Sequence, residues 1–501
     1  MIFEPQDIHE RVLDCDVCLV GSGASGGAAA WYLARSGLNV VCLEAGGHYT
    51  ESDFSRDFGV ASRQLYAEDG QRIMSGNLFI PVAGGECIGG STVINSGICF
   101  RIPEERFEQW RRDWGLDFSF QDLVPHIETV EQMIGVGPSN PAIFGGNNAF
   151  CMKGLEELGW AGGPMPRNAP GCVGCGSCNI GCPTGAKLSV AKTFIPASEE
   201  FGANFYTWAR AEEALMDGNK VVGVRARLGN PKLDEDHGWL EVRAKAVVLC
   251  AGAIQTPVFL QRNQLGNGHV GQHLRVHPAT GVIATTNQEV NGWNGVPQGF
   301  YCDEFLADDA MILESYWASP EVFYMAFPFG HEGTGKMAEF GQMAALGGTI
   351  ADEGEGSVKQ LGGGGKVRVS YDLVDADRRR LIRMLQRICQ LLFAAGAREI
   401  QPGVHGLPAL KTMDEARRWL DEDRIRAKQL MSLYSSHPQA TARMGERPED
   451  SVVDCSGAVY GHEGLYVMDA SVFPDVLGVN PQVTVMSLAL LLSDRLANRM
   501  A

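Results

Sequence analysis

The chain has 501 residues, of which 45% are hydrophobic, and it carries a formal net charge of −18 at pH 7. This length exceeds what one hydrophobic core usually covers, so two packed domains are expected. The negative field repels polyphosphates and argues against a nucleic-acid partner. The first residues lack the basic and apolar parts of a secretory signal, and no apolar run is long enough to cross a bilayer. We therefore expect a cytoplasmic protein without a transmembrane segment.

The N-terminal region has the pattern of a β–α–β unit. Residues 16–20 and 39–43 are short apolar runs that predict buried parallel strands, and residues 26–36 predict a helix of small residues between them. The turn before the helix reads Gly21-Ser-Gly23-Ala-Ser-Gly26, a pattern that lets a pyrophosphate approach the helix N-terminus. Glu44 ends the second strand, where an acid accepts hydrogen bonds from ribose hydroxyls. The unit predicts a dinucleotide site, and by itself leaves NAD and FAD open.

Similar elements recur far downstream. A strand at 246–250 precedes a helix at 254–262, and a strand at 465–468 precedes a final helix at 481–498. The nucleotide-binding elements thus stand at the start, middle and end of the chain, which predicts a discontinuous domain. The part between about 278 and 430 predicts a separate layer of short mixed strands with an amphipathic helix near 378–395.

Four further segments together resemble the glucose–methanol–choline (GMC) oxidoreductase family. They are residues 84–95 (GGECIGGSTVIN), similar to the family's Gly-Gly-Ser loop; 251–257 (AGAIQTP), similar to its second signature; 270–278 (VGQHLRVHP); and 437–445 with 467–474 and Asn480-Pro481, similar to its C-terminal catalytic block. The likeness keeps the family's order and is thin between about 280 and 430. It is nearest to cysteine-bearing members that resemble long-chain or aromatic alcohol oxidases.

The resemblance implies a fold class that combines α/β and α+β parts. It implies a discontinuous, Rossmann-like FAD-binding domain and a mixed-sheet substrate-binding domain. The expected boundaries are 1–105, 185–277 and 430–501 for the FAD-binding domain, 106–184 for a connecting segment with a cysteine-rich loop, and 278–429 for the substrate-binding domain. The implied cofactor is FAD, and its expected contacts are Gly21, Gly23, Ala24, Ser25, Gly26, Glu44, Ala45, Gly90, Ser91, Asn95, Ala251, Gly252, Asp469, Ala470, Asn480, Pro481 and Gln482.

The implied reaction is oxidation of a primary or secondary alcohol by hydride transfer to the flavin, with oxygen or another acceptor taking the electrons. Such a reaction needs a base for the hydroxyl proton and a group that holds the oxygen. The resemblance assigns these roles to His437 and Asn480. Asn480 also directly precedes Pro481 and a long apolar helix, so a helix N-cap is the alternative for it. His273 and His277 are expected to have structural roles.

The sequence gives one indication of the substrate class. The aromatic segment 316–329 is able to line an apolar pocket, which favours aliphatic or aromatic alcohols over sugars, although ordinary core aromatics are an equally good interpretation. A sugar-alcohol dehydrogenase of the same family is therefore an alternative. The sequence does not choose between oxidase and dehydrogenase.

The chain contains a run of four cysteines, Cys172-x2-Cys175-x2-Cys178-x3-Cys182-Pro183, with the spacing of iron–sulfur ligands in bacterial ferredoxins. A single 3Fe-4S or 4Fe-4S cluster is one interpretation, with Cys182 the doubtful ligand, and a loop of free thiols is the other. A flavin with a cluster also suits an electron-transfer protein without substrate chemistry, but such a relay needs no base like His437. A nicotinamide-dependent dehydrogenase is disfavoured by the C-terminal block.

Overall fold

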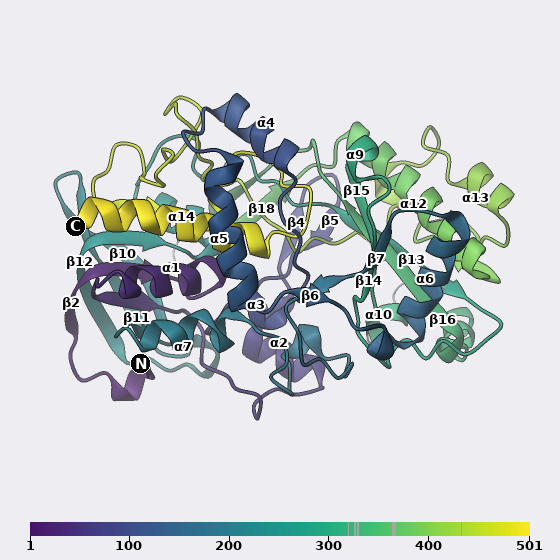
Figure 1. The fold of residues 1–501 in the computed structure, drawn as a ribbon, viewed down its shortest axis with the longest axis horizontal. Coiled ribbons are helices and arrows are strands. Elements are labelled where there is room, and N and C mark those ends of the chain that lie inside the picture. The colour runs from purple at the N-terminus through teal and green to yellow at the C-terminus, as the bar shows by residue number, and fades with distance from the viewer. Residues whose placement is uncertain (319, 325–326, 328–329, 363–366, 432) are drawn as a thin grey trace.

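The computed structural model describes residues 1–501 except 319, 325–326, 328–329, 363–366 and 432. Two large sheets lie beside each other, each with its own helices (Figure 1). The first has the order β1 (Ile2–Phe3), β9 (Asn204–Tyr206), β3 (Val40–Leu43), β2 (Val12–Val20), β12 (Gly238–Leu249), β11 (Lys220–Leu228) and β10 (Ala209–Asp217), with β20 (Leu465–Val467) paired to β12. From β1 to β12 the strands are parallel, and β10 and β11 add an antiparallel hairpin.

The elements predicted around the first sheet are present. The helices are α1 (Ala24–Arg35), α8 (Gly252–Arg262) and α14 (Gln482–Met500). Helix α1 packs against α14 and against α7 (Phe194–Glu199), and α14 also packs against α5 (Phe120–Met133). Strand β2 begins at Val12 rather than at residue 16, because its more exposed first residues still pair with β12 and carry no apolar run.

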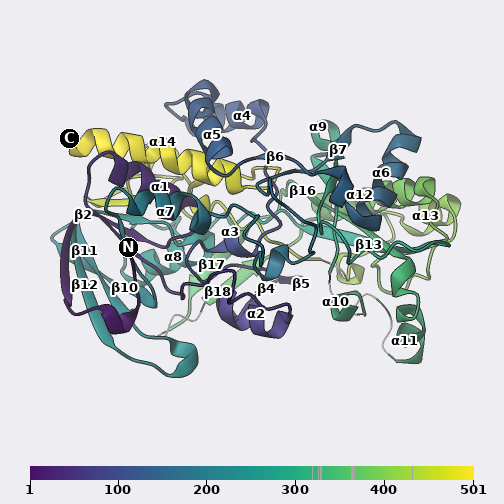
Figure 2. The ribbon, with the colours of Figure 1, turned by 60° about the horizontal axis from the view of Figure 1, so that its bottom comes forward.

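The second sheet is antiparallel, in the order β19 (Glu399–Gln401), β13 (Ala279–Thr285), β16 (Met343–Ile350), β15 (Met311–Ser315), β14 (Phe300–Cys302) and β7 (Gly162–Pro164). Helices α12 (Asp375–Ala395) and α6 (Gly145–Leu158) cover one face, and α10 (Pro320–Tyr324) lies on the other side (Figure 2). Alternate strand residues separate these faces: Val282 and Ala284 join the core under α12, whereas Ile283 packs with Phe323 of α10.

A smaller sheet of β17 (Gly356–Gln360), β18 (Val367–Tyr371), β4 (Ile73–Ser75) and β5 (Phe79–Pro81) and the pair β6 (Gly137–Pro138) and β8 (Pro166–Arg167) complete the strands. The remaining α-helices are α2 (Phe58–Leu65), α3 (Ser91–Ile94), α4 (Glu104–Trp114), α9 (Leu306–Asp309), α11 (His331–Met337) and α13 (Met413–Trp419).

The predicted fold class is confirmed: a Rossmann-like parallel sheet, drawn from the start, middle and end of the chain, lies beside a layer that contains the antiparallel second sheet and the smaller sheet of mixed strand directions. The predicted domain boundaries stay a prediction, and two strand pairings cross them. Strand β7, from the expected connecting segment, pairs with β14, and β4 pairs with β18. In the part of the chain that the structure describes, we find no helix whose length and apolar character would let it span a bilayer.

Candidate active site

A cavity of about 920 Å³ is lined by residues of both large sheets. All of the predicted cofactor contacts line it except Gly26, and so do His437 and Asn480. Gly26 serves the turn instead, since a Cβ there would stand 1.9 Å from the carbonyl oxygen of Gly21. The structure therefore brings the two ends of the predicted site together in one space.

The glycine turn has no room for side chains. Gly21 has φ +100°, and a Cβ there would stand 2.6 Å from the carbonyl oxygen of Cys250. Gly90, from the Gly-Gly-Ser loop, has φ +51°, and its Cβ would stand 2.9 Å from Cα of Gly23. The two loops thus meet backbone to backbone at the N-terminus of α1, where exposed N–H groups and the helix dipole favour a phosphate.

Glu44 ends β3 as predicted, and its carboxylate is held on both sides. One oxygen accepts hydrogen bonds from N and Oγ of Ser22, at 3.0 and 2.6 Å, and the other accepts from the Gly46 N–H at 2.9 Å. Burial raises the pKa of Glu44, and these hydrogen bonds oppose the rise. The oxygen that accepts only from Gly46 keeps a free lone pair, so the fixed group still has capacity for a ribose hydroxyl.

Partly buried hydrogen bonds join the sequence signatures to one another. Asp469 accepts hydrogen bonds from the N–H groups of Gly252 and Ser471, both at 2.8 Å. Asn95 donates to Oε1 of Gln482 at 2.9 Å, which ties the Gly-Gly-Ser loop to the first turn of α14. The segments that resemble the family in sequence are thus neighbours in space.

His437 is half-buried, and burial lowers its pKa to about 4, so the imidazole is neutral near pH 7. Its Nδ1 lies 3.1 Å from Nδ1 of His277. His277 is buried, and its pKa is lowered well below the ordinary value by burial and then by the charge of His437. His277 was expected to have only a structural role, and its contact with His437 was not predicted from the sequence. His273 lies elsewhere, 3.0 Å from a carboxylate oxygen of Glu355.

Asn480 does not cap α14. The N-cap residue is Pro481, and no side chain of the described residues caps this helix. The Oδ1 atom of Asn480 is buried and has no hydrogen-bond partner among the described residues. The N-cap alternative is therefore wrong, because the helix begins one residue later and the amide points elsewhere.

Glu314 is a site residue that sequence reasoning missed. It lines the same cavity, is only 5% exposed, and burial raises its pKa to about 7, which the amides of Asn480 and Gln298 partly oppose. Its Oε1 has no hydrogen-bond partner among the described residues. Met311 and Leu313 belong to the core under α12, so Glu314 faces the opposite side of β15. One feature of the sequence could have indicated Glu314: it is the single charged residue of β15, and the rest of that strand is apolar or small and buried.

The aromatic segment falls partly outside the described residues, at 319, 325–326 and 328–329. Of the described part, Tyr316, Trp317 and Phe323 line the cavity. Trp317 and Phe323 contact each other with ring centroids 4.5 Å apart. The wall of the cavity near Glu314 is therefore largely aromatic.

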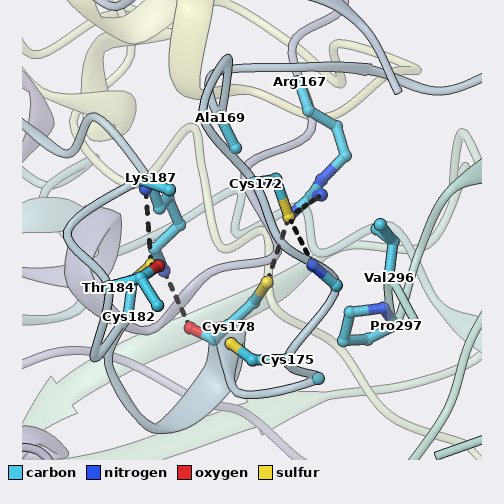
Figure 3. Close-up of a pocket in the computed structure, with 13 residues that line it drawn as sticks. Arg167, Ala169, Cys172, Cys175, Cys178, Cys182, Thr184, Lys187, Val296 and Pro297 are labelled. Carbon is cyan, nitrogen blue, oxygen red and sulfur yellow. Dashed lines mark hydrogen bonds between the residues drawn. The ribbon is translucent and has the colours of Figure 1, made fainter. Parts of the chain in front are cut away.

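The four cysteines of the run line a second, small cavity of about 10 Å³, together with Arg167 and Lys187 (Figure 3). Arg167 donates to the sulfur of Cys178 at 3.0 Å and approaches that of Cys172 at 3.9 Å. Among the described residues, no three side chains of His, Cys, Asp or Glu are placed to hold a single metal ion. The thiols thus share one space without converging on one point.

Lys187 and Arg167 are each 3% exposed, and sequence reasoning missed both. Lys187 donates to the carbonyl oxygens of Val93, Asn95 and Cys178 at 2.6–2.8 Å. Burial lowers its pKa to about 8, against the opposing effect of the cysteine sulfurs. Within the described residues neither cation is paired with a carboxylate, so their nearest candidates for counter-charge are the sulfurs.

The fold combines a Rossmann-like sheet with a second sheet, and the two share one cavity. This arrangement is that of a dinucleotide-dependent oxidoreductase with a separate substrate-binding part. Residues 62–279 and 357–489 match family models described as GMC oxidoreductase, and residues 19–57 match one described as an NAD(P)-binding Rossmann-like domain. An uncharacterized GMC-type oxidoreductase of Mycobacterium tuberculosis is 37% identical over 489 residues, covering 97% of this chain and 76% of the relative. The chain belongs to the GMC oxidoreductase family and is an FAD-dependent enzyme, as the sequence resemblance predicted.

Two further proteins, one curated relative and one solved structure, are similar to the chain over most of its length. A long-chain-alcohol oxidase of Arabidopsis thaliana is 30% identical over 528 residues, covering 98% of this chain and 69% of the relative. The crystal structure of pyridoxine 4-oxidase from Mesorbium loti has a TM-score of 0.74 at 20% identity and covers 96% of this chain and 99% of that one. At that identity the structure supports the shared fold alone.

Proposed function

We propose that the protein oxidises an apolar primary or secondary alcohol to an aldehyde or ketone, with His437 and Asn480 in contact with the alcohol oxygen. The single observation that carries the proposal is the shared cavity, which His437 and Asn480 line together with the glycine turn. FAD, when bound, supplies the acceptor for the hydride of the carbinol carbon. The chain's own residues seat the adenosine half, orient the alcohol and exclude water.

The lining of the cavity supports an apolar substrate over a sugar. Tyr316, Trp317 and Phe323 offer aromatic faces, whereas a sugar needs several hydrogen-bond partners around its ring. The relatives named long-chain-alcohol oxidases point in the same direction. Electrons then leave to oxygen or to another acceptor.

The test is an anaerobic screen of alcohols that follows the flavin absorbance of the purified FAD-loaded protein. Long-chain aliphatic and aromatic alcohols are expected to bleach the flavin, and sugars are not. His437→Gln is expected to slow flavin reduction by about 100-fold or more while the flavin spectrum stays. His405→Gln, an exposed position outside the cavity, is the matched control. A wild-type flavin that no alcohol reduces would contradict the proposal and favour an electron-transfer role.

We also propose that the four-cysteine cavity holds an iron–sulfur cluster, with Cys172, Cys175 and Cys178 as ligands and Cys182 as the fourth in a 4Fe-4S form. The support is electrostatic: Arg167 and Lys187 are buried cations that have no carboxylate partner in the described part of the chain, and an anionic metal–thiolate centre supplies the missing charge. A cluster spreads its ligands around several irons, so it does not need the thiols to converge on one ion. Neutral thiols leave both cations uncompensated.

Iron and acid-labile sulfide analysis of anaerobically purified protein, with an EPR spectrum, tests the cluster. About three to four irons and about four sulfides are expected per FAD, as a 3Fe-4S or 4Fe-4S cluster requires. Cys178→Ser is expected to lose iron and keep FAD, and Cys15→Ser, a half-buried thiol far from the run, is the matched control. Protein that holds FAD but neither iron nor sulfide, even after anaerobic reconstitution with both, would leave the loop of free thiols as the correct interpretation.

A further inference from the structure

The cavity between the two large sheets reaches the molecular surface past apolar side chains. Phe79 of β5 lines the cavity and is 78% exposed, and Met431 lines it and is 53% exposed. Pro81, the last residue of β5, also lines the cavity and is exposed. Both ribbon views place β4 and β5 between the two large sheets (Figure 1, Figure 2). Residues that line a cavity and are also exposed to solvent mark an opening of that cavity.

Backbone contacts hold the two sides of this opening together. The N–H of Ser435 donates to the carbonyl oxygen of Pro81 at 3.0 Å, and the segments around them form a parallel bridge. Because the two segments run in the same direction, Phe79 and Met431 lie at the same end of the pair. His437 follows Ser435 by two residues at the other end. The second segment therefore leads from the opening to the proposed reaction centre.

The apolar surface of the opening continues onto β4. The strand register pairs Ile73 with Pro81 and Met74 with Ile80. Met74 and Ile80 are buried, so Ile73, which is 53% exposed, shares the outer face of the hairpin with Phe79 and Pro81. Single exposed apolar side chains are common in proteins, whereas a group of them that adjoins a binding cavity is typical of a ligand contact.

An alkyl chain matches both the chemistry and the length of this path. Between the two ends, the wall of the cavity includes Leu433 and the aromatic residues Tyr316 and Trp317. The segment from Met431 to His437 spans at most about 20 Å, since an extended chain rises by no more than about 3.6 Å per residue. A long alkyl chain covers this distance, and a short alcohol does not.

We propose that Ile73, Phe79, Pro81 and Met431 form a subsite for the far methylenes of a long-chain alcohol, whose hydroxyl end lies at His437. This inference rests on the proposed function and specifies its substrate as a chain whose far end projects into solvent. Each methylene that moves from water to apolar surroundings favours binding roughly fourfold. These contacts lie far from the reacting atoms and are the same in the ground state and the transition state, so they strengthen binding and leave the chemical step unchanged.

Hydroxy acids of two lengths test whether the far end is open, with reduction of the flavin in the FAD-loaded protein as the measurement. The short 6-hydroxyhexanoate would hold its carboxylate inside the cavity, where loss of water penalises the charge. The long 16-hydroxyhexadecanoate carries its carboxylate past Phe79 into water. We expect the long acid to reach half-saturation at a concentration at least about 100-fold lower than the short one. Protein whose flavin is reduced by 1-decanol but by neither acid has a closed pocket, which would overturn the proposal.

The combined variant Phe79→Ser and Met431→Ser tests the subsite residues. Both positions are exposed, so the core stays intact. We expect the half-saturating concentration of 16-hydroxyhexadecanoate to rise about tenfold, since each methylene returned to water costs roughly fourfold in binding. The limiting rate constant and all values for 1-butanol are expected to stay unchanged. Phe201→Ser with Met216→Ser, at positions 48% and 43% exposed and outside the cavity, is the matched control. An unchanged half-saturating concentration for the long acid, or an equal loss for 1-butanol, would contradict the subsite.

A ligand that cannot be oxidised separates this inference from the proposed function. The methyl ether 16-methoxyhexadecanoate has no hydroxyl proton, and calorimetric titration of the FAD-loaded protein measures its binding. The variant at Phe79 and Met431 is expected to bind it about tenfold more weakly than the wild type and the control variant do. If no alcohol reduces the wild-type flavin, the proposed function fails and this titration alone decides on the subsite. Equal affinities in the wild type and the variant, or no binding to the wild type, would then overturn it.

Discussion

Glu314 carries a charge where burial penalises it, and this has a consequence for stability. Its pKa is raised to about 7 in the folded protein, above the ordinary value of 4.5. The folded state thus holds the proton more tightly than the unfolded state, so stability falls as pH rises from about 4.5 to about 7 and is constant above. Glu314→Gln removes this penalty, which is worth up to about 3 kcal/mol at pH 8 and little near pH 4.5.

Thermal unfolding of the FAD-loaded proteins at pH 5 and pH 8 measures the effect. The variant is expected to raise the unfolding midpoint at pH 8 by several degrees more than at pH 5. The exposed Glu289→Gln should shift neither midpoint. If Glu314→Gln shifts the unfolding midpoint equally at both pH values, ionisation of the buried carboxyl costs no stability. That result would contradict a pKa of Glu314 near 7.

At this scale the sequence identified residues that lie within recognisable motifs, such as His437, Asn480 and Glu44. It missed Glu314, whose one signal was a lone charge in a buried strand, and it missed Arg167 and Lys187, because nothing adjacent to these two in the chain marks their role. The role of His277 depends on Gly478, which is 201 residues away, and on His437, 160 residues away. Only the pairing of distant segments creates that chain of hydrogen bonds.

At the scale of elements, the cofactor end of the cavity depends on two loops that touch through glycine backbones. Gly90→Ala is expected to weaken FAD binding by at least tenfold. Its Cβ would stand 2.9 Å from Cα of Gly23, and its φ of +51° with ψ of −139° is strained for any other residue. Titration of FAD into the apoprotein, followed by flavin fluorescence, measures the change.

Gly37→Ala separates the contact between the loops from simple backbone strain. Gly37 also has a positive φ, +88°, but a Cβ there meets no atom of the described residues within 4 Å, and it follows the end of α1 away from the cavity. It is expected to lower stability slightly and leave FAD affinity unchanged. If both variants lose affinity equally, the close approach of the loops is not what seats the cofactor.

Elements with strong local patterns were predictable, and sheet membership was not. Helix α14 is buried almost all round, so it appears as a continuous apolar run, and α12 has a clear amphipathic period. Strands β13, β15 and β16 are buried on both faces, with α12 on one side and the cavity or α10 on the other. They therefore lack the alternation that marks a half-exposed strand, and their order is decided by pairings that the sequence does not display.

At the scale of the whole molecule, the cofactor is expected to be a structural part of the protein. The cavity of about 920 Å³ is lined by both large sheets, so FAD that fills it contacts both and binds only the folded chain. Ligand that binds only the folded state stabilises it by about 4 kcal/mol at a thousandfold excess over its Kd. Removal of FAD should therefore lower the unfolding midpoint by several degrees, and added FAD should restore it with a logarithmic dependence on concentration.

ADP distinguishes between two ways in which this stabilisation arises. It carries the part of FAD that the glycine turn and Glu44 are expected to hold, and it has no isoalloxazine ring to reach the second sheet. If the cofactor joins the two layers, saturating ADP should recover only a minor part of the midpoint that FAD recovers. Asn95→Ala removes the hydrogen bond to Gln482 that ties the Gly-Gly-Ser loop to α14. In this variant, the part of the midpoint increase that FAD gives and ADP does not should be lost. A midpoint that ADP restores in full would mean that the dinucleotide turn alone is stabilised, and that the two sheets hold together without help from the flavin.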